Sequence, residues 1–258
     1  MGIEHAPSER PENSSSPCCG RRCVRWIVAG LLAISLIGAY LLMARHYQRS
    51  ANTEQCRNHL RQIMLAMHNY GDHYGVFPAA YIANAAREPA HSWRVLLVPY
   101  YCSTFNNNYR FSEPWNSPHN LQLEAKEGDS WRRLYRCPNQ PDYRTSPITN
   151  YVAVVGPQTA FPGATGRTRR DLCRGSSHTI FVVEYANSDI HWMEPRDLNL
   201  AQMSLRLNDP DRPSVSSNDP GGPAVVSFDT VVRRLPESTT PESLRALLTT
   251  DGGEPVTP

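Results

Sequence analysis

The longest hydrophobic stretch of the chain runs from Trp26 to Ala44 (WIVAGLLAISLIGAYLLMA), between Arg25 and Arg45. Its 19 residues carry no charge, and as a helix they would span roughly 28 Å, close to the ~30 Å hydrocarbon thickness of a bilayer. A buried core helix or a cleaved signal peptide would also be apolar. However, a core helix rarely lacks charge over this length, and the following MARHYQ offers no small-x-small cleavage site. The pattern therefore predicts a retained membrane anchor over residues 25–45.

From residue 51 to residue 74 the pattern becomes amphipathic. Apolar side chains recur at spacings of three and four, at Cys56, Leu60, Ile63, Met64, Met67, Tyr70 and Tyr74. The spacing predicts that the anchor helix continues here, with this apolar stripe packed against a sheet and with Gly71, Gly75 and Pro78 ending the helix. The spacings between His59, His68 and His73 do not align on one helix face. These histidines are therefore expected at the surface or its boundary rather than around a metal ion.

The second half of the chain is predicted to form short strands. Apolar, β-branched segments bounded by turn residues occupy 150–155, 179–184, 224–228 and 231–235, and the last two form a hairpin across Asp229-Thr230. Short helices are expected over 92–101 with Ser92 as N-cap, over 120–127, and over 241–248, with a polar and aromatic loop over 105–118. A long N-terminal helix packed on a small antiparallel sheet with long loops is a pilin-like α+β fold.

Charge and length set the domain organisation. The chain has 258 residues, a formal net charge of +2 and no lysine/arginine block with interleaved aromatics, so no nucleic-acid partner is predicted. We expect a disordered cytoplasmic tail over 1–24, a transmembrane helix over 25–45, a domain over 46–250 and a loose tail over 251–258. Positive charges on the two sides of the anchor are nearly balanced. The short N-terminal tail and the large cysteine-containing domain favour a cytoplasmic N-terminus and an extracytoplasmic C-terminal domain.

The seven cysteines divide around the anchor. Three cysteines precede the anchor, at Cys18, Cys19 and Cys23. Lipidation or metal capture by these residues is an alternative to an ordinary cytoplasmic tail, although their spacing is too cramped for a metal site by itself. Four more follow the anchor and could form two disulfides on an oxidising side, with three pairings open: Cys56, Cys102, Cys137 and Cys173.

Several blocks of sequence, taken in order, resemble a large bacterial family best known from planctomycetes. The blocks span 56–80, 92–101, 113–120, 135–141, 149–163, 176–200 and 219–254. The family pairs a pilin-like N-terminal helix with a long extracytoplasmic domain of unknown function, sometimes labelled solute-binding-like. The resemblance implies a pseudopilin-like protein in a type II secretion-like or other cell-envelope system, with the cytoplasmic membrane and other pilin-like or envelope proteins as partners.

Two departures from the family pattern matter. Relatives often begin with a prepilin motif, G-F-T-L-x-E, which is missing here, so prepilin processing and polymerisation are left open. The family tail usually reads H-P-G-G-x-N and then a D-G-S turn. This chain instead has Asp219-Pro220-Gly221-Gly222-Pro223-Ala224 and Asp229-Thr230-Val231. If the missing residues form a polar site in relatives, that site is lost or changed in this chain.

The sequence contains no strong catalytic motif: G-x-S-x-G, H-E-x-x-H, G-x-x-x-x-G-K-[ST] and G-x-G-x-x-G are all missing. A strand-end carboxylate at Glu184, or Glu194, beside His191 could act as an acid–base pair, but an ordinary solvated or hydrogen-bonded carboxylate is the commoner case. We therefore expect no enzyme, with an uncharacterised hydrolase as the alternative. No cofactor is expected.

Two further binding features are weighed. An oxygen-rich loop could hold calcium through Asp209, Asp211 and Asp219, near Asn218, although its spacing is not that of an EF-hand. Trp115, Trp131 and Trp192 could form an aromatic binding surface, although buried anchors are the commoner use of tryptophan. The favoured function is a single-pass, membrane-anchored structural or interaction protein. The alternative is a membrane-tethered solute- or glycan-binding module that uses the tryptophans and the 105–118 loop.

Overall fold

The computed structural model describes residues 18–103, 105, 108–140, 142–173 and 178–250, with side chains from residue 24 onward except that of Cys173. It divides into an N-terminal unit that ends at Gln48 and a C-terminal domain that begins at Arg49. Helix α1 (Cys18–Tyr74) is continuous over 57 residues, as the sequence predicts. The expected tail over 251–258, and most of the tail over 1–24, lie outside the described residues.

The first part of α1 is apolar and exposed. It contains a window long and apolar enough to cross a bilayer, and no residue of that window is buried. Large apolar side chains such as Trp26, Leu36 and Met43 are more than two-thirds exposed, at 79%, 71% and 74%. A core helix of a soluble protein would be mostly buried, so this helix is a candidate membrane anchor.

The second part of α1 supplies one wall of the main core. The predicted stripe is buried from Cys56 to Met67, whereas Tyr70 is half-buried and Tyr74 is exposed. The helix ends at Tyr74 because Gly75 adopts a φ of 76°, the left-handed conformation in which glycine commonly stops helices. Gly71 lies inside the helix rather than at its end, where its missing side chain leaves room for the ring of Phe77.

The C-terminal domain is built on a five-stranded mixed sheet in the order β5-β3-β4-β6-β7. The strands are β3 (Tyr151–Val155), β4 (Ile180–Glu184), β5 (Leu198–Asn199), β6 (Ala224–Ser227) and β7 (Val232–Arg234). Neighbours pair antiparallel except β3 and β5, which are parallel. Four of these strands were predicted, with ends that differ by a residue or two. β5 was missed because two residues are too few to show a pattern.

Both faces of this sheet are buried, which explains why the strands read as continuous apolar segments rather than alternating ones. Tyr151 and Ala153 of β3 face the core that contains the α1 stripe. Val152 and Val154 face a second core, which includes Leu244 and Leu248 of the closing helix α5 (Pro241–Leu248). The sheet therefore separates two layers, and α1 and α5 pack on its opposite faces.

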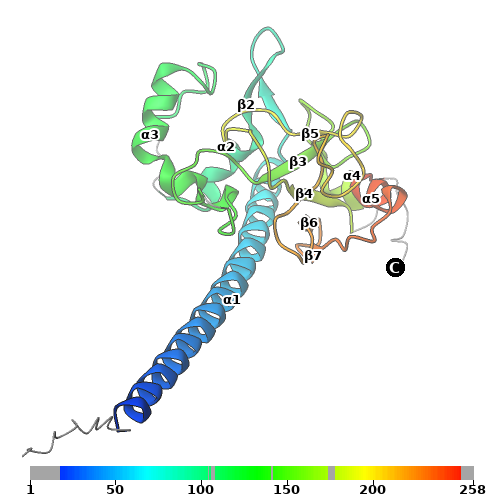
Figure 1. Ribbon diagram of the computed structural model, residues 1–258. Coiled ribbons are helices and arrows are strands. Elements are labelled where there is room, and N and C mark those ends of the chain that lie inside the picture. The colour runs from blue at the N-terminus through cyan, green and yellow to red at the C-terminus, as the bar shows by residue number, and fades with distance from the viewer. Residues whose placement is uncertain (1–17, 104, 106–107, 141, 174–177, 251–258) are drawn as a thin grey trace, which may run out of the picture. The chain divides into compact units, whose positions relative to one another are not determined.

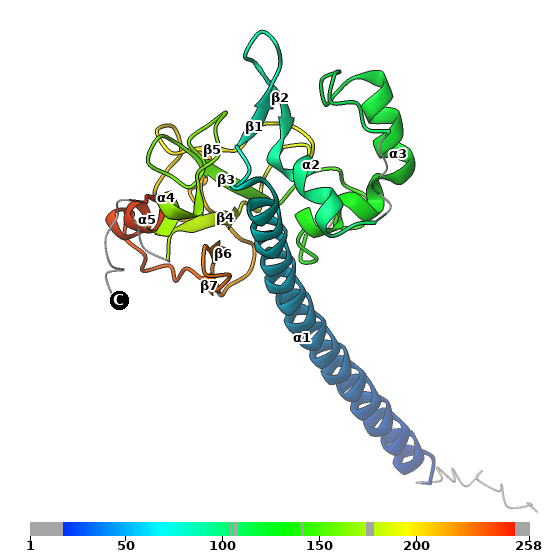
Figure 2. The ribbon, with the colours of Figure 1, turned by 180° about the vertical axis from the view of Figure 1, so that it is seen from behind.

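The remaining helices and a small hairpin complete the domain. They are β1 (Tyr81–Ala83), β2 (Pro89–Ser92), α2 (Trp93–Leu97), α3 (Pro118–Arg132), α4 (Arg169–Cys173) and 3-10 helices over Val98–Tyr100 and Arg133–Tyr135. Ser92 caps α2 by accepting a hydrogen bond from the backbone N–H of Arg94, as predicted. In both ribbon views α3 and α5 lie at opposite sides of the domain (Figures 1 and 2).

Helix α3 is longer than the predicted 120–127 segment. Ser117 caps it and Pro118 starts it, so it begins earlier than expected. It also continues through Gly128, beyond the predicted end at residue 127. A side chain at Gly128 would lie 2.7 Å from a carboxylate oxygen of Glu124. Glu124 instead folds over Gly128 and accepts hydrogen bonds from Arg132 and from the Trp192 indole.

The β6–β7 hairpin has a three-residue loop, so the two-residue turn predicted at Asp229-Thr230 is wrong. The backbone N–H of Thr230 donates to Ser227 O at 2.9 Å, and Thr230 has a φ of 66°. A tight turn followed by a left-handed residue is the usual three-residue hairpin loop, in which glycine is favoured at the last position. Here a β-branched threonine occupies that position.

Candidate functional site

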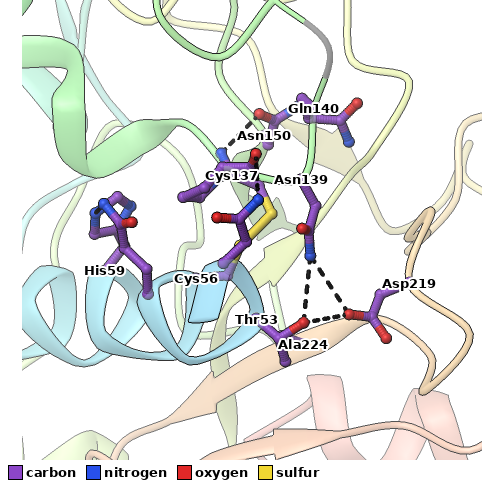
Figure 3. Close-up of a disulfide and its surroundings, with 12 residues drawn as sticks. Thr53, Cys56, His59, Cys137, Asn139, Gln140, Asn150, Asp219 and Ala224 are labelled. Atoms are coloured by element: carbon purple, nitrogen blue, oxygen red, sulfur yellow. Dashed lines mark hydrogen bonds between the residues drawn. A yellow bond between two sulfur atoms is a disulfide. The ribbon is translucent and has the colours of Figure 1, made fainter. Parts of the chain in front are cut away.

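A disulfide joins α1 to the segment that follows α3. Cys56 and Cys137 are bonded, both are buried, and 81 residues separate them in sequence (Figure 3). Of the three pairings left open, only the one that joins these two cysteines agrees with this bond. Asn150 supports the Cys137 backbone by accepting its N–H at 2.9 Å. Cys102 lies 3.8 Å from Ser130 Oγ, and the side chain of Cys173 lies outside the described residues.

Beside this disulfide, Asp219 gathers polar groups from three parts of the chain (Figure 3). Thr53 of α1 donates its hydroxyl to Asp219 Oδ2 at 2.7 Å, and Asn139 Nδ2 donates to Thr53 Oγ1 at 3.3 Å. From β7, the Arg234 guanidinium pairs with the same carboxylate at 3.0 Å. We call Thr53, Asn139, Asp219 and Arg234 the Asp219 cluster. It holds the first turns of α1 in the domain against the 219–223 loop and β7.

The pKa values of two carboxylates in this region, Asp219 and Glu184, are shifted in opposite directions. Burial opposes ionisation of Asp219, but hydrogen bonds from Thr53 and Gly221, with the charge of Arg234, hold its pKa below the usual range. Burial raises the pKa of Glu184, and the Ala224 N–H only partly offsets this effect. Glu184 Oε2 accepts that N–H at 3.0 Å, and the residue is 2% exposed. Glu184 therefore fixes β4 to β6 and is not open to solvent.

Two open, adjoining recesses that share three lining residues lie next to the Asp219 cluster, and we treat them as two lobes of one feature. Its first lobe, of 430 Å³, is bounded by residues 185–187 and 208–218. Its second lobe, of 360 Å³, is bounded by residues 207–208, 217–223 and 235–237. Asn208, Ser217 and Asn218 line both lobes. Both volumes fall within the range of small-molecule sites. We call this feature the two-lobed recess.

Among the described ion pairs, the most completely buried one lies elsewhere, between Arg94 and Asp197. Both side chains are 0% exposed, and they form an ion pair. Asp197 also accepts hydrogen bonds from the Trp93 indole at 3.1 Å and from the Ala153 N–H at 2.8 Å. Burial raises the pKa of Asp197 to about 6, although Arg94 and these donors act in the opposite direction. The pair joins α2 to β3 and is closed to solvent.

The acid–base candidates of the sequence do not form one constellation. Glu184 binds the Ala224 amide, as described above. Glu194 pairs with Arg196 at 2.7 Å and accepts the backbone N–H of His191 at 3.2 Å. The His191 ring stacks on Trp115, with ring centres 4.9 Å apart. Each group is therefore engaged in a separate structural contact.

The calcium candidates are also divided. Asp209 accepts hydrogen bonds from the Ser204 hydroxyl at 2.6 Å and from the Asp211 N–H at 3.0 Å, within its own loop. Asp219 is bound to Arg234 in the Asp219 cluster. Within the part of the chain that the structure describes, no three His, Cys, Asp or Glu side chains are placed to hold a metal ion.

The three histidines that the sequence singled out, all in α1, differ in their surroundings. His59 is buried, contrary to the prediction, and its Nδ1 lies 3.0 Å from Arg136 O. The prediction failed because it considered α1 alone, and the segment joined by the disulfide covers this face. His68 is half-buried beside Phe228 O, and His73 is exposed.

The tryptophans do not form the aromatic surface considered from the sequence. Trp131 and Trp192 are both fully buried, and the Trp192 indole donates to Glu124. Trp115 is partly covered by His191. The described part of the 105–118 loop, residues 105 and 108–117, is irregular as expected, and Pro118 begins α3. Tyr109 within it is buried and hydrogen-bonds His91 at 2.8 Å. The tryptophans therefore act mainly as core anchors.

Sequence reasoning missed the Arg94–Asp197 pair and the two-lobed recess. A signal for the pair was present, because Arg94 is the one charged residue of the otherwise apolar SWRVLLVPYY segment. Asp197 lies 103 residues away in a loop, and nothing local identified it as the partner. The recess comes from residues 185–187, 207–223 and 235–237, which only the folded chain brings together.

Comparison with known proteins finds a family that is similar to part of the chain. Residues 49–169 match the sequence profile of a family described as a protein of unknown function (DUF1559). The matched region begins at the first residue of the C-terminal domain. No curated protein and no solved structure matches the chain.

Proposed function

We propose that the protein is a non-enzymatic, single-pass membrane protein that holds its C-terminal domain outside the cytoplasmic membrane. The observation that carries this proposal is the apolar window of α1, none of which is buried by the described protein. Exposed apolar area of this extent is stable in lipid and unfavourable in water. A cytoplasmic N-terminus agrees with the Cys56–Cys137 disulfide, because such bonds persist on the oxidising side of the membrane.

The role we propose is structural or interactive, as a pseudopilin-like component of a secretion or envelope system of the type II kind. The continuous α1, the small sheet that it packs on, and the match to a family of unknown function support this proposal. Partners would be the cytoplasmic membrane and other pilin-like or envelope proteins. The alternative is a membrane-tethered solute- or glycan-binding module that uses the tryptophans and the 105–118 loop. Trp131 and Trp192 are buried, so those two tryptophans offer no open surface for it.

Two measurements test the anchor and its orientation. Alkaline carbonate should leave the chain in the membrane pellet, and release into the supernatant would contradict a spanning helix. In intact spheroplasts, a membrane-impermeant maleimide should label an Asp211→Cys variant at its exposed loop. The unsubstituted chain, treated identically, is the control. Labelling that appears only after lysis would reverse the proposed orientation.

Intact mass then tests the pseudopilin-like proposal. A mature chain cut within residues 20–35, with a methylated new N-terminus, would indicate pilin-type processing and a filament subunit. A chain that starts at Met1 or Gly2 would indicate a permanent anchor and exclude the polymerising version of this proposal.

A further inference from the structure

The two-lobed recess offers an unusual concentration of side-chain amides. Asn187, Asn208 and Asn218 are all exposed, and all three line it. An amide presents an acceptor oxygen and two donor hydrogens on one flat group. Asn208 and Asn218 stand where the two lobes meet. Asn208 Oδ1 accepts the Ser217 N–H at 2.8 Å, and Asn218 Nδ2 donates to Gln140 Oε1 at 3.2 Å. A ligand would therefore meet the amide N–H groups of Asn208 and the amide oxygen of Asn218. This arrangement suits a ligand whose own groups both donate and accept, as hydroxyl groups do.

The charges around the recess favour a neutral ligand. Asp209 is held by Ser204, and Asp219 by Thr53 and Arg234. Arg212, the one cation among the described residues that line a lobe, donates to the backbone carbonyl of Gln202 at 2.8 Å. Exposed carboxylates remain at Asp211 and Glu237, one in each lobe. These would repel an anion.

Apolar surface in the same walls is present in small pieces. Tyr185, which is half-buried, lines the first lobe together with Pro210 and Pro213. Pro220 and Pro223 line the second lobe. A sugar ring has apolar C–H faces between its hydroxyl groups. The short apolar surfaces of the recess match the C–H faces, and the amides match the hydroxyl groups. Rings of tyrosine supply such an apolar body with a polar end.

We propose that the two-lobed recess binds a neutral oligosaccharide, with neighbouring sugar rings in the two lobes and with Asn208 and Asn218 between them. Each lobe is large enough for a small-molecule group of this size. The site is separate from the tryptophans and the 105–118 loop. It is also independent of the anchor, so the two proposals can fail separately.

The test uses the full chain in a zwitterionic detergent, because glycoside detergents carry sugar head groups that would compete for the site. Isothermal titration with maltotriose, cellotriose and triacetylchitotriose should detect binding of at least one trisaccharide. The corresponding monosaccharide should bind at least tenfold more weakly, because it can fill only one lobe. A trigalacturonate of the same length, which is anionic, should also bind at least tenfold more weakly than the best neutral trisaccharide.

Three alanine variants locate the site. Asn218→Ala, in both lobes, should weaken binding of that trisaccharide at least tenfold, and Asn187→Ala, in the first lobe, severalfold. Asn69→Ala is the matched control, because Asn69 is an exposed asparagine of α1 outside the recess, and its affinity should be unchanged. All three positions are exposed, and unchanged thermal midpoints would verify folding. Failure of every neutral trisaccharide to bind, or equal affinity in Asn218→Ala and Asn69→Ala, overturns the proposal.

Discussion

Two aspartate–arginine pairs of the C-terminal domain make similar bonds in different surroundings. Arg94–Asp197 is wholly buried between α2 and β3, whereas Arg234–Asp219 keeps about a fifth of its side-chain surface exposed beside α1, with 21% and 16%. The first carboxylate has a raised pKa and the second a lowered one. The comparison teaches that the desolvation of a pair, rather than its bond count, decides whether ionisation is favoured.

The largest effect is expected from Asp197→Ala. The change leaves the Arg94 charge buried without its partner and removes the acceptor of the Trp93 and Ala153 N–H groups. Breaking a buried pair in this way costs about 3–5 kcal/mol of unfolding free energy. Urea denaturation followed by tryptophan fluorescence measures it. Asp189→Ala, at an exposed pair with Arg196, is the control, with about 1 kcal/mol or less expected. Equal losses in both variants would contradict this role.

Removing the disulfide should have the next largest effect, and it acts beside the Asp219 pair. The Cys56→Ser/Cys137→Ser double variant opens a loop of 81 residues, and loss of such a bond costs about 2–4 kcal/mol. The denaturant midpoint of the double variant should match that of the reduced protein. If reduction and the double substitution both leave the midpoint unchanged, the bond does not stabilise the domain.

A pH series should separate the two aspartates by sign. The raised pKa of Asp197, about 6, means that its contribution to stability falls as pH rises from about 4 to 6. The cost of Asp197→Ala should therefore be about 2 kcal/mol larger at pH 4 than at pH 7. The lowered pKa of Asp219 acts oppositely, because its contribution is present above about pH 4 and lost below it. The cost of Asp219→Asn should accordingly shrink as pH falls towards 3. Parallel trends in the two variants would refute this assignment.

At neutral pH, Asp219→Asn should cost about 1 kcal/mol, because the pair is partly exposed and an amide oxygen can still accept one hydrogen bond. Thr53→Val removes the hydroxyl partner and tests the same contact from α1. The double variant should lose less unfolding free energy than the sum of the two single variants, because both single changes break the same hydrogen bond. Strict additivity would show that Thr53 and Asp219 do not interact.

The smallest effect is a gain in stability. Thr230 holds a left-handed conformation in the loop before β7, the strand that carries Arg234. Thr230→Gly should raise the unfolding free energy by about 0.5–1 kcal/mol, because glycine adopts this conformation without a steric penalty. The thermal midpoint measures it. Asp229→Gly is the control. Asp229 has no left-handed conformation to relieve, and its side chain accepts the Val231 N–H, so this change should not stabilise the protein.

The parts of the fold that follow a local pattern could be predicted from sequence. The α1 stripe from Cys56 to Met67, the Ser92 cap and the strand over 180–184 all have signals within a few neighbouring residues. Features that need distant partners could not. β5, the burial of His59 and the Arg94–Asp197 pair each depend on segments that meet only after folding.

The candidate site was still less predictable. Asp209, Asp211 and Asp219 are close in sequence, which suggested one ion-binding loop, but their hydrogen bonds point to different partners. The polar residues that line the two-lobed recess carry no motif, because asparagine and serine are also the ordinary residues of loops. Only their convergence in space distinguishes them.

The contacts of Figure 3 use residues that emerge at different times during synthesis. Cys56 can be oxidised with its partner once Cys137 has emerged, whereas the Asp219 cluster needs residues up to Arg234. The disulfide can therefore form before Asp219 contacts Thr53, which lies three residues before Cys56 on the same face of α1. A nascent chain stopped between residues 140 and 218 would carry the disulfide without the Asp219 cluster. Limited proteolysis of such a chain should therefore differ from that of the finished protein.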